Sequence, residues 1–266
     1  MSDTPYVDKQ NVLHILDEKI LPGQRKRLDL HTAKLFTTSS VEVPVIVERS
    51  KKKGPVVLVT AGIHGDELNG VEIVRQFLAQ KMNRPLIGTI ICIPVLNVFG
   101  FLNMQREFPD GRDLNRIFPG TKKGPLASRF AYQLTNEILP AVDYAFDFHT
   151  GGAKRFNAAQ IRIAKNDSTL KTLAEVFNAP FTVYSSNIKK SYRSTCKQNN
   201  IPVLLYEGGE ALRFDTEAIR VGMEGIFRVM TALDMCSPIA VSPPPSPRVV
   251  SQSKWVRASR SGLLRL

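Results

Sequence analysis

Cysteine is scarce in this 266-residue chain, and the few cysteines follow no disulfide or metal-binding pattern. Cys92, Cys196 and Cys236 are odd in number and include no CxxC pair. Such a set is typical of a reducing compartment rather than of a secreted disulfide framework. Cys92 lies in an apolar run, residues 90–93, so we interpret it as a small core residue and not as a catalytic thiol.

Targeting segments and long apolar runs are also missing. The N-terminus is polar and contains no basic region followed by an apolar stretch, so the sequence predicts neither a secretory signal nor a membrane anchor. No segment reaches the roughly 18 consecutive apolar residues of a membrane-spanning helix. We therefore expect a cytoplasmic protein without a membrane partner.

Acidic residues are too few to balance the basic ones: 24 Asp and Glu face 36 Lys and Arg, a formal net charge of +12. A basic balance suits nucleic acid, a membrane surface or small anionic substrates. The charges are dispersed, however, and no expected helix or strand carries a dense Lys/Arg stripe interleaved with aromatics. We expect no nucleic-acid partner, and the sequence leaves the oligomeric state open.

Apolar runs alternate with helical patterns along most of the chain. Residues 55–61 (PVVLVTA) are almost all apolar, as in a strand buried on both faces. In residues 67–81 apolar side chains recur at helical spacing, with Asp66 placed to cap the start. This alternation predicts an α/β fold, with a mixed, mainly parallel central sheet and helices on both faces. Further strands are expected at 41–47 (a half-buried edge), 86–95, 144–148 and 202–206, and further helices at 126–139, 170–177 and 216–233.

Proline density marks a boundary near the C-terminal end. Residues 1–236 are expected to form the main domain, and the segment 237–247 (SPIAVSPPPSP) reads as a semi-rigid linker. Residues 248–266 form a basic tail without Asp or Glu, which contains one plausible strand at 254–258. A lone strand cannot stabilise itself, so this tail resembles the first part of a further structural unit.

Two histidines and a glutamate lie where expected strands end. His64 and Glu67 follow the strand at 55–61 within GIHGDE, and His149 ends the strand of FDFHTGG. Two histidines and one carboxylate, with a coordination position left for water, are the ligand set of hydrolytic zinc sites, which predicts one Zn²⁺ per chain. Asp147 would share a strand face with His149 and could orient it. The alternatives are a loop histidine, a glutamate that stabilises a helix start and a core histidine.

Two further segments carry polar groups suited to catalysis and binding. Glu207 ends the expected strand at 202–206, where a carboxylate could act as general base toward water. Asn115 and Arg116 lie in a long loop, residues 97–120, and such a pair can grip a carboxylate. The alternative for that loop is a solvated basic segment with a turn at residues 119–120.

Four motifs in order resemble the succinylglutamate desuccinylase and aspartoacylase family, which is related to the zinc carboxypeptidases. They are HGDE (64–67), RDLNR (112–116), DFHTGG (147–152) and YEGGE (206–210), and the resemblance covers about residues 41–233. It implies that His64, Glu67 and His149 bind zinc and that Glu207 is the catalytic glutamate. It also implies that Asn115 and Arg116 hold the free carboxylate of the substrate.

The same resemblance implies an arginine that polarises the scissile carbonyl, and Arg106 matches it better than Arg112. Residues 1–236 would then be the catalytic domain of a zinc-dependent deacylase that cleaves the amide bond of a small anionic N-acyl amino acid. Longer members continue past a segment similar to residues 255–258 into a small β domain, which would be truncated here. The alternatives are a metallocarboxypeptidase that acts on peptides and a catalytically inactive binding protein of the same fold.

Overall fold

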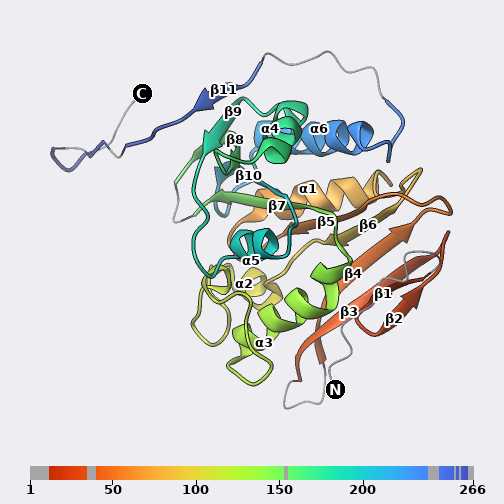
Figure 1. The fold of residues 1–266 in the computed structure, drawn as a ribbon. Coiled ribbons are helices and arrows are strands. Elements are labelled where there is room, and N and C mark those ends of the chain that lie inside the picture. Colours follow the sequence, from red (N-terminus) through yellow and green to blue (C-terminus); the bar gives the residue numbers. More distant parts are fainter. Residues whose placement is uncertain are drawn as a thin grey trace.

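The computed structural model describes residues 12–34, 40–152, 155–238, 246–254, 256–257 and 259–262. A nine-stranded sheet in the order β11-β9-β8-β10-β7-β5-β6-β4-β3 runs through the molecule (Figure 1). Its strands are β3 (Arg25–Lys34), β4 (Ser40–Arg49), β5 (Val56–Ala61), β6 (Thr89–Ile93), β7 (Tyr144–Gly151), β8 (Asn157–Ile163), β9 (Phe181–Tyr184), β10 (Val203–Glu210) and β11 (Arg248–Val250). A separate hairpin joins β1 (Leu13–Ile15) to β2 (Glu18–Ile20).

Helices cover both faces of this sheet. On one side lie α1 (Leu68–Ala79), α4 (Ser168–Phe177) and α6 (Thr216–Ala232), and on the other lie α2 (Val98–Asn103), α3 (Leu126–Gln133) and α5 (Tyr192–Gln198) (Figure 1). The pairs β10–β7, β7–β5 and β5–β6 are parallel, whereas β3–β4, β4–β6 and β8–β10 are antiparallel. The predicted α/β fold, with a mixed, mainly parallel sheet between two helical layers, is confirmed.

The buried strands separate two hydrophobic cores. In β5, Val57 and Val59 pack into the core beneath α1, α4 and α6, while Leu58 between them packs into the opposite core with α3 and α5. Side chains alternate between the two faces of a strand, so a strand buried on both sides is apolar along most of its length. This is why residues 55–61 contain no polar alternation.

Several boundaries differ from the sequence prediction. Strand β4 is internal, between β3 and β6, and not an edge, because the unpredicted β3 pairs along its whole length. Asp66 does not cap α1, whose N-cap residue is Glu67 without a side-chain capping bond. The helix expected at 126–139 is α-helical only to Gln133, after which a π turn (Leu134–Ile138) and a 3-10 turn (Leu139–Ala141) follow.

The C-terminal region also departs from the prediction. Residues 254, 256 and 257 form no strand; the strand of this region is β11, which pairs in parallel with β9 at the edge of the main sheet. Most of the proposed linker, residues 239–245, and the proposed strand residues Trp255 and Ala258 lie outside the described residues. Among the described helices, none combines the length and apolar character needed to cross a membrane.

Candidate functional site

Three neighbouring parallel strands, β5, β7 and β10, bring the chemical motifs together at one edge of the sheet. The order β10-β7-β5 places the carboxyl ends of these strands side by side, and Glu207 of β10 is the register partner of His149 of β7. Loops at the carboxyl ends of parallel strands line the ligand-binding crevice of α/β proteins. Here they border a cavity of about 560 Å³, which all seven predicted site residues line: His64, Glu67, Arg106, Asn115, Arg116, His149 and Glu207.

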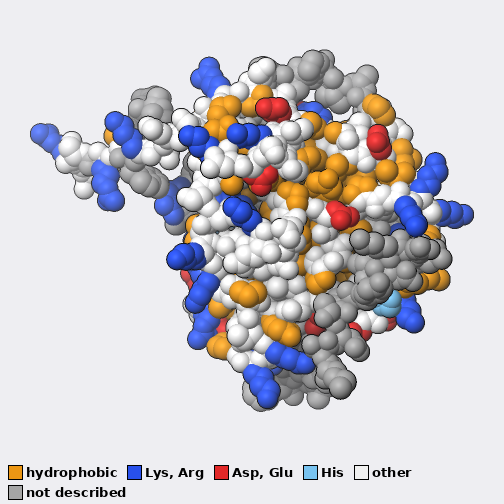
Figure 2. All heavy atoms as spheres, viewed as in Figure 1, with side chains coloured by type: hydrophobic (Ala, Val, Ile, Leu, Met, Phe, Trp, Pro, Cys, Tyr) orange, Lys and Arg blue, Asp and Glu red, His pale blue; other side chains and the backbone are white. Residues whose placement is uncertain are grey.

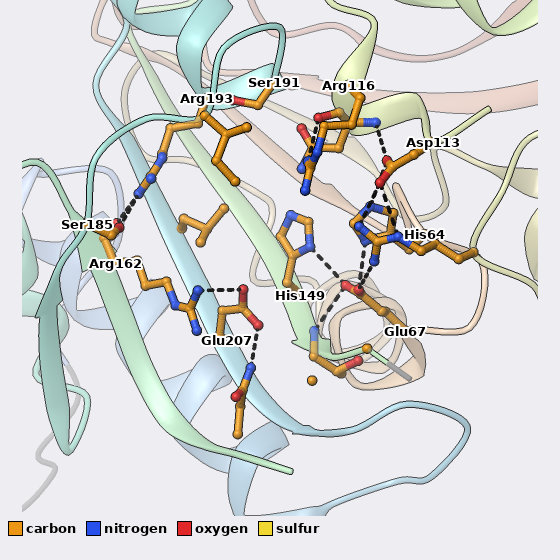
Figure 3. A pocket seen from close by; sticks show the side chains of 18 of the residues that line it. His64, Glu67, Asp113, Arg116, His149, Arg162, Ser185, Ser191, Arg193 and Glu207 are labelled. Atoms are coloured by element: carbon orange, nitrogen blue, oxygen red, sulfur yellow. Dashed lines mark hydrogen bonds and ion pairs between the residues drawn. The ribbon is translucent and has the colours of Figure 1, made fainter. Parts of the chain in front are cut away.

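His64, Glu67 and His149 lie close together in the lining of this cavity (Figure 3). Each offers a ligand atom within 4.8 Å of the others. The two Glu67 carboxylate oxygens lie 2.7 Å from Nδ1 of His64 and 2.9 Å from Nδ1 of His149. All three residues are buried, with 3%, 2% and 4% of their surface exposed. Two imidazole nitrogens and a carboxylate oxygen this close together could hold a metal ion.

Each histidine is oriented by a carboxylate on its far ring nitrogen. Nε2 of His149 lies 2.9 Å from Oδ2 of Asp147, as the shared strand face predicts, and Nε2 of His64 lies 3.2 Å from Oδ1 of Asp113. Such contacts are typical of metal-binding histidines, because they fix the ring and make the free nitrogen a better donor. The role of Asp113 was not predicted, although it lies within the RDLNR motif.

The electrostatics of this group suit a cation. Burial alone would raise the pKa of Glu67, but the adjacent His64 and His149 rings outweigh it and hold that pKa well below its usual range. For His149, burial acts to lower the pKa, yet Asp147 and Glu67 raise it well above the usual value. The surrounding carboxylates thus favour positive charge at this point, which a metal ion would supply.

Arg106 lies beside the histidine–glutamate group. Its Nε and Nη2 donate to Oδ2 of Asp113 at 3.1 and 2.8 Å, and its Nη1 is 3.5 Å from Oε1 of Glu67. Arg112, the less favoured alternative, does not line the cavity and pairs with Asp110 at 3.2 Å. Of the two arginines, Arg106 is therefore the one that lines the cavity.

Asn115 and Arg116 belong to a short 3-10 turn, Leu114–Arg116, whose N-cap residue is Asp113. The Asn115 side-chain oxygen accepts a 2.8 Å hydrogen bond from the backbone N–H of Tyr192, which ties the turn to α5. Arg116 donates to the backbone oxygen of Asn115 at 2.8 Å and forms no ion pair with any residue that the structure describes. Its guanidinium is available to an anion in the cavity.

Glu207 lies across His149 from Glu67 in Figure 3. Its Oε2 accepts a 2.7 Å hydrogen bond from Asn157, and its Oε1 is 3.7 Å from Nη1 of Arg162. Burial raises the pKa of Glu207, although His149 and Arg162 act in the opposite direction. A carboxylate with a raised pKa is better suited to accept and return a proton near neutral pH.

Sequence reasoning missed a second group of cavity-lining residues. It comprises Arg155, Asn157, Arg162, Ser185 and Arg193. Strand β8, which carries two of them, was not predicted, because its sequence NAAQIRI lacks a continuous apolar run. The only available signal was three arginines between the DFHTGG and YEGGE motifs, and spacing alone does not show that they meet.

Comparisons with known proteins found one family model, a curated relative and similar solved structures. Residues 53–233 match the family model of the succinylglutamate desuccinylase/aspartoacylase catalytic domain. A curated relative, the N-alpha-acetyl-L-2,4-diaminobutyric acid deacetylase of Halomonas elongata, is 32% identical over 114 residues. That match covers 42% of this chain and 33% of the relative, so the aligned part spans about a third of the relative's length.

Two solved structures are similar over most of the chain. A succinylglutamate desuccinylase/aspartoacylase from Rhodobacter sphaeroides is 26% identical with a TM-score of 0.74, covering 85% of this chain and 71% of that one. The product-bound ectoine utilization protein EutE (DoeB) from Ruegeria pomeroyi is 23% identical, also with a TM-score of 0.74, covering 94% and 76%. At that identity the second likeness concerns the fold alone.

Proposed function

The chain belongs to the succinylglutamate desuccinylase/aspartoacylase family, and from that premise we propose that it is a zinc-dependent hydrolase of N-acyl amino acids. The observation that carries this proposal is the meeting of a buried His–Glu–His group and Glu207 in one cavity. The reaction would add water across the amide bond and release a carboxylate and an amino acid. The three unpaired cysteines support the reducing, cytoplasmic location that we propose with it.

His64, Glu67 and His149 would hold the metal, one ion per chain. When bound there, zinc supplies a Lewis acid next to the scissile carbonyl. The carboxylates Asp147 and Asp113 keep both imidazoles in the orientation that this binding needs.

Glu207 is proposed as the general base and acid. It takes a proton from the attacking water and returns it to the leaving nitrogen, so that the amide C–N bond breaks as the amine forms. Asn157 holds one Glu207 oxygen at 2.7 Å, and the other, 3.7 Å from Arg162, would accept the proton. Proton transfer by a positioned carboxylate typically contributes about 10²- to 10⁴-fold to the rate.

Arg106 is proposed to stabilise the oxyanion that forms from the carbonyl oxygen. Asp113 holds this guanidinium from one side, so its orientation is set before substrate binds. A preorganised donor of this kind contributes on the order of 3 kcal/mol to catalysis. Asn115 and Arg116, which also line the cavity, would fix a free carboxylate of the substrate.

Hydrolysis of N-acyl amino acids, with peptides of similar size for comparison, tests the proposal. We expect release of the amino acid, sensitivity to chelators, and about one zinc per chain by elemental analysis. His149→Ala should lose both metal and activity. Faster cleavage of peptides would favour a metallocarboxypeptidase, and absence of both metal and hydrolysis would favour an inactive binding protein.

A further inference from the structure

A basic surface lies at the edge of the sheet opposite the cavity. Three connections form it: residues 21–24 between β2 and β3, residues 50–55 between β4 and β5, and residues 80–88 between α1 and β6. We propose that this surface, the basic platform, docks the protein on an anionic lipid membrane. The proposal goes beyond the catalytic function, because none of these residues lines the cavity.

Backbone hydrogen bonds join the three connections into one surface. The N–H of Arg49 donates to the Gln24 oxygen at 3.0 Å. The N–H of Ser50 donates to the Gly88 oxygen, and the N–H of Gly88 donates to the Lys52 oxygen, both at 2.9 Å. The connections therefore hold fixed positions relative to one another, and their side chains can meet one partner together.

The platform carries positive charge that its own segments do not neutralise. Residues 19–27, 49–55 and 80–88, which include the adjoining strand ends, contain ten Lys and Arg and no Asp or Glu. The lysines at 51–53 are exposed and form no ion pair with any residue that the structure describes. Lys and Arg side chains gather at the right-hand edge of Figure 2, where these connections lie in Figure 1. The ten basic residues are Lys19, Arg25, Lys26, Arg27, Arg49, Lys51, Lys52, Lys53, Lys81 and Arg84.

Fewer carboxylates border the platform. Glu18 pairs with Lys26 at 2.8 Å, and Glu48 pairs with Arg25 at 2.9 Å. Five carboxylates in all face the ten basic side chains, so the platform keeps a clear excess of positive charge. The other three are Asp29, Asp143 and Asp234.

Two exposed leucines lie among the basic side chains. Leu21 is 46% exposed and Leu86 is 53% exposed. Leu21 begins a turn in which the Gln24 side-chain oxygen accepts a 2.8 Å hydrogen bond from the Leu21 N–H. The Leu86 backbone oxygen accepts a 2.7 Å hydrogen bond from the Ser50 hydroxyl. Apolar side chains surrounded by Lys and Arg suit an anionic bilayer, because the leucines enter the interface while the cations meet lipid phosphates.

The composition of the platform favours a membrane over nucleic acid. Single-stranded nucleic acids bind to aromatic side chains that stack on bases, and the three segments contain no Phe, Tyr or Trp. A duplex is read by a helix or a β-ribbon in a groove, whereas the platform presents connections. The expectation of no membrane partner rested on the lack of an anchor and of a spanning segment, and peripheral binding needs neither.

Docking through the platform would leave the cavity open to solution. Residues 50–55 and 80–88 precede β5 and β6, whereas the cavity lies at the carboxyl ends of β5, β7 and β10. The six residues of β5 separate the two edges by roughly 20 Å. A small molecule in solution can therefore reach the cavity while the platform faces a bilayer.

Co-sedimentation with lipid vesicles tests the proposal. Phosphatidylcholine vesicles that contain about 30% phosphatidylglycerol are compared with vesicles of phosphatidylcholine alone. The wild type should bind only the anionic vesicles, and more weakly as ionic strength rises. The triple variant Lys51→Gln, Lys52→Gln, Lys53→Gln should bind about 100-fold more weakly, since each basic side chain near such a surface contributes about fivefold.

The matched control is the triple variant Lys122→Gln, Lys123→Gln, Arg129→Gln, which removes the same charge from exposed residues outside the platform. It should bind like the wild type. Thermal unfolding checks that both triple variants keep the fold.

Leu21→Ser and Leu86→Ser test the apolar part of the contact. Each should weaken vesicle binding by about fivefold without changing its salt dependence, because roughly half of one leucine side chain is withdrawn from water. Absence of binding to anionic vesicles would overturn the proposal. Equal losses in the two triple variants would do the same, because they would show an effect of net charge alone. Preferential retention of duplex DNA, lost when lysines 51–53 are replaced, would assign the platform to nucleic acid instead.

Discussion

Glu67 organises the candidate metal site at the scale of single residues. One of its oxygens contacts His64, and the other contacts His149 and accepts a 3.1 Å hydrogen bond from the backbone N–H of Thr150. Asp113 has a similar double role, because one oxygen meets His64 and the other holds Arg106. Two carboxylates therefore connect the proposed metal ligands to the arginine that would contact substrate.

Glu207→Gln should abolish most of the proposed activity while the protein keeps its metal. The amide cannot accept the proton, so we expect kcat to fall by about 10²- to 10⁴-fold. Stability should not fall, because burial already disfavours the charged form of Glu207. Steady-state kinetics, elemental analysis and thermal unfolding together check this. Loss of metal along with activity would contradict the assignment of Glu207 as a base that does not bind the metal.

The pH dependence of kcat/KM should report the raised pKa of Glu207. A general base acts in its deprotonated form, and burial raises the pKa of this carboxyl above that of an ordinary glutamate. Activity should therefore be full at higher pH and decline as pH falls through a value above about 4.3, the ordinary glutamate pKa. A pH–rate profile measures this limb. A midpoint at or below the ordinary value would contradict the assignment.

Asp113→Asn should weaken both of the contacts that Asp113 makes. We expect metal affinity to fall by about 10- to 100-fold, as for other partners of metal-binding histidines, and kcat to fall because Arg106 loses its ion pair. Metal titration and kinetics measure the two effects. Asp110→Asn is the matched control, since Asp110 pairs with Arg112 outside the cavity. Similar losses in both variants would argue against a specific role for Asp113.

At the scale of elements, close packing of α1 on β7 sets the distance between the proposed ligands. Glu67 immediately precedes α1, and His149 lies on β7. Gly70 of α1 lies very near Phe148 of β7. A Cβ atom added at Gly70 would be 2.6 Å from the backbone oxygen of Phe148 and 2.8 Å from the Cβ of Phe148. A glycine here lets the helix approach the strand closely enough for Glu67 to reach His149.

Gly70→Ala tests this packing. Replacing glycine by alanine inside a helix normally stabilises by up to about 1 kcal/mol. Here the clash with Phe148 should outweigh that gain and destabilise the fold by about 1–3 kcal/mol, with weaker metal binding as α1 moves away from β7. Chemical denaturation and metal titration measure the two effects. A variant that is more stable and binds metal normally would refute the argument.

At the scale of the whole molecule, the site lies near the middle of the nine-stranded sheet, between the two hydrophobic cores. Away from the basic platform, Lys and Arg side chains are scattered over the face seen in Figure 2 rather than gathered into one stripe. Hydrophobic side chains gather near α1 and α6 on that face (Figure 2), where a shallow groove is lined by Met82, Ile219, Met223 and Phe227. The arginines that lie close together are instead those that line the cavity.

Metal binding should stabilise the whole fold, because the ligands come from distant segments that only the folded chain brings together. At a free zinc concentration 100 times the dissociation constant, linkage gives about 2.7 kcal/mol. For a chain of this size that corresponds to a rise in Tm on the order of 5–10 °C. Thermal unfolding with and without zinc checks it, and His149→Ala should show no such rise. An equal rise in that variant would indicate binding elsewhere.

Sequence alone determined the parts of the protein that local pattern encodes. Apolar runs such as residues 55–61 must form strands buried on both faces, and these predicted the α/β fold and the sheet edge where His64, His149 and Glu207 meet. The choice of Arg106 came from the motif resemblance, whereas Asn115 and Arg116 were also indicated by their place in the long loop, and each of these residues lines the cavity. Their catalytic and binding roles stay predictions.

Tertiary structure alone decided what depends on pairing between distant segments. Strand β8 is partly polar, and its antiparallel pairing with β10 is what brings Asn157 and Arg162 to Glu207. Arg193 of α5 contacts Arg162, and Asp113 contacts His64 although 49 residues separate the two in the sequence. A strand whose apolar residues do not alternate regularly carries little information about its neighbour, because burial on one face is what specifies register. Only the folded sheet determines which polar groups share the cavity.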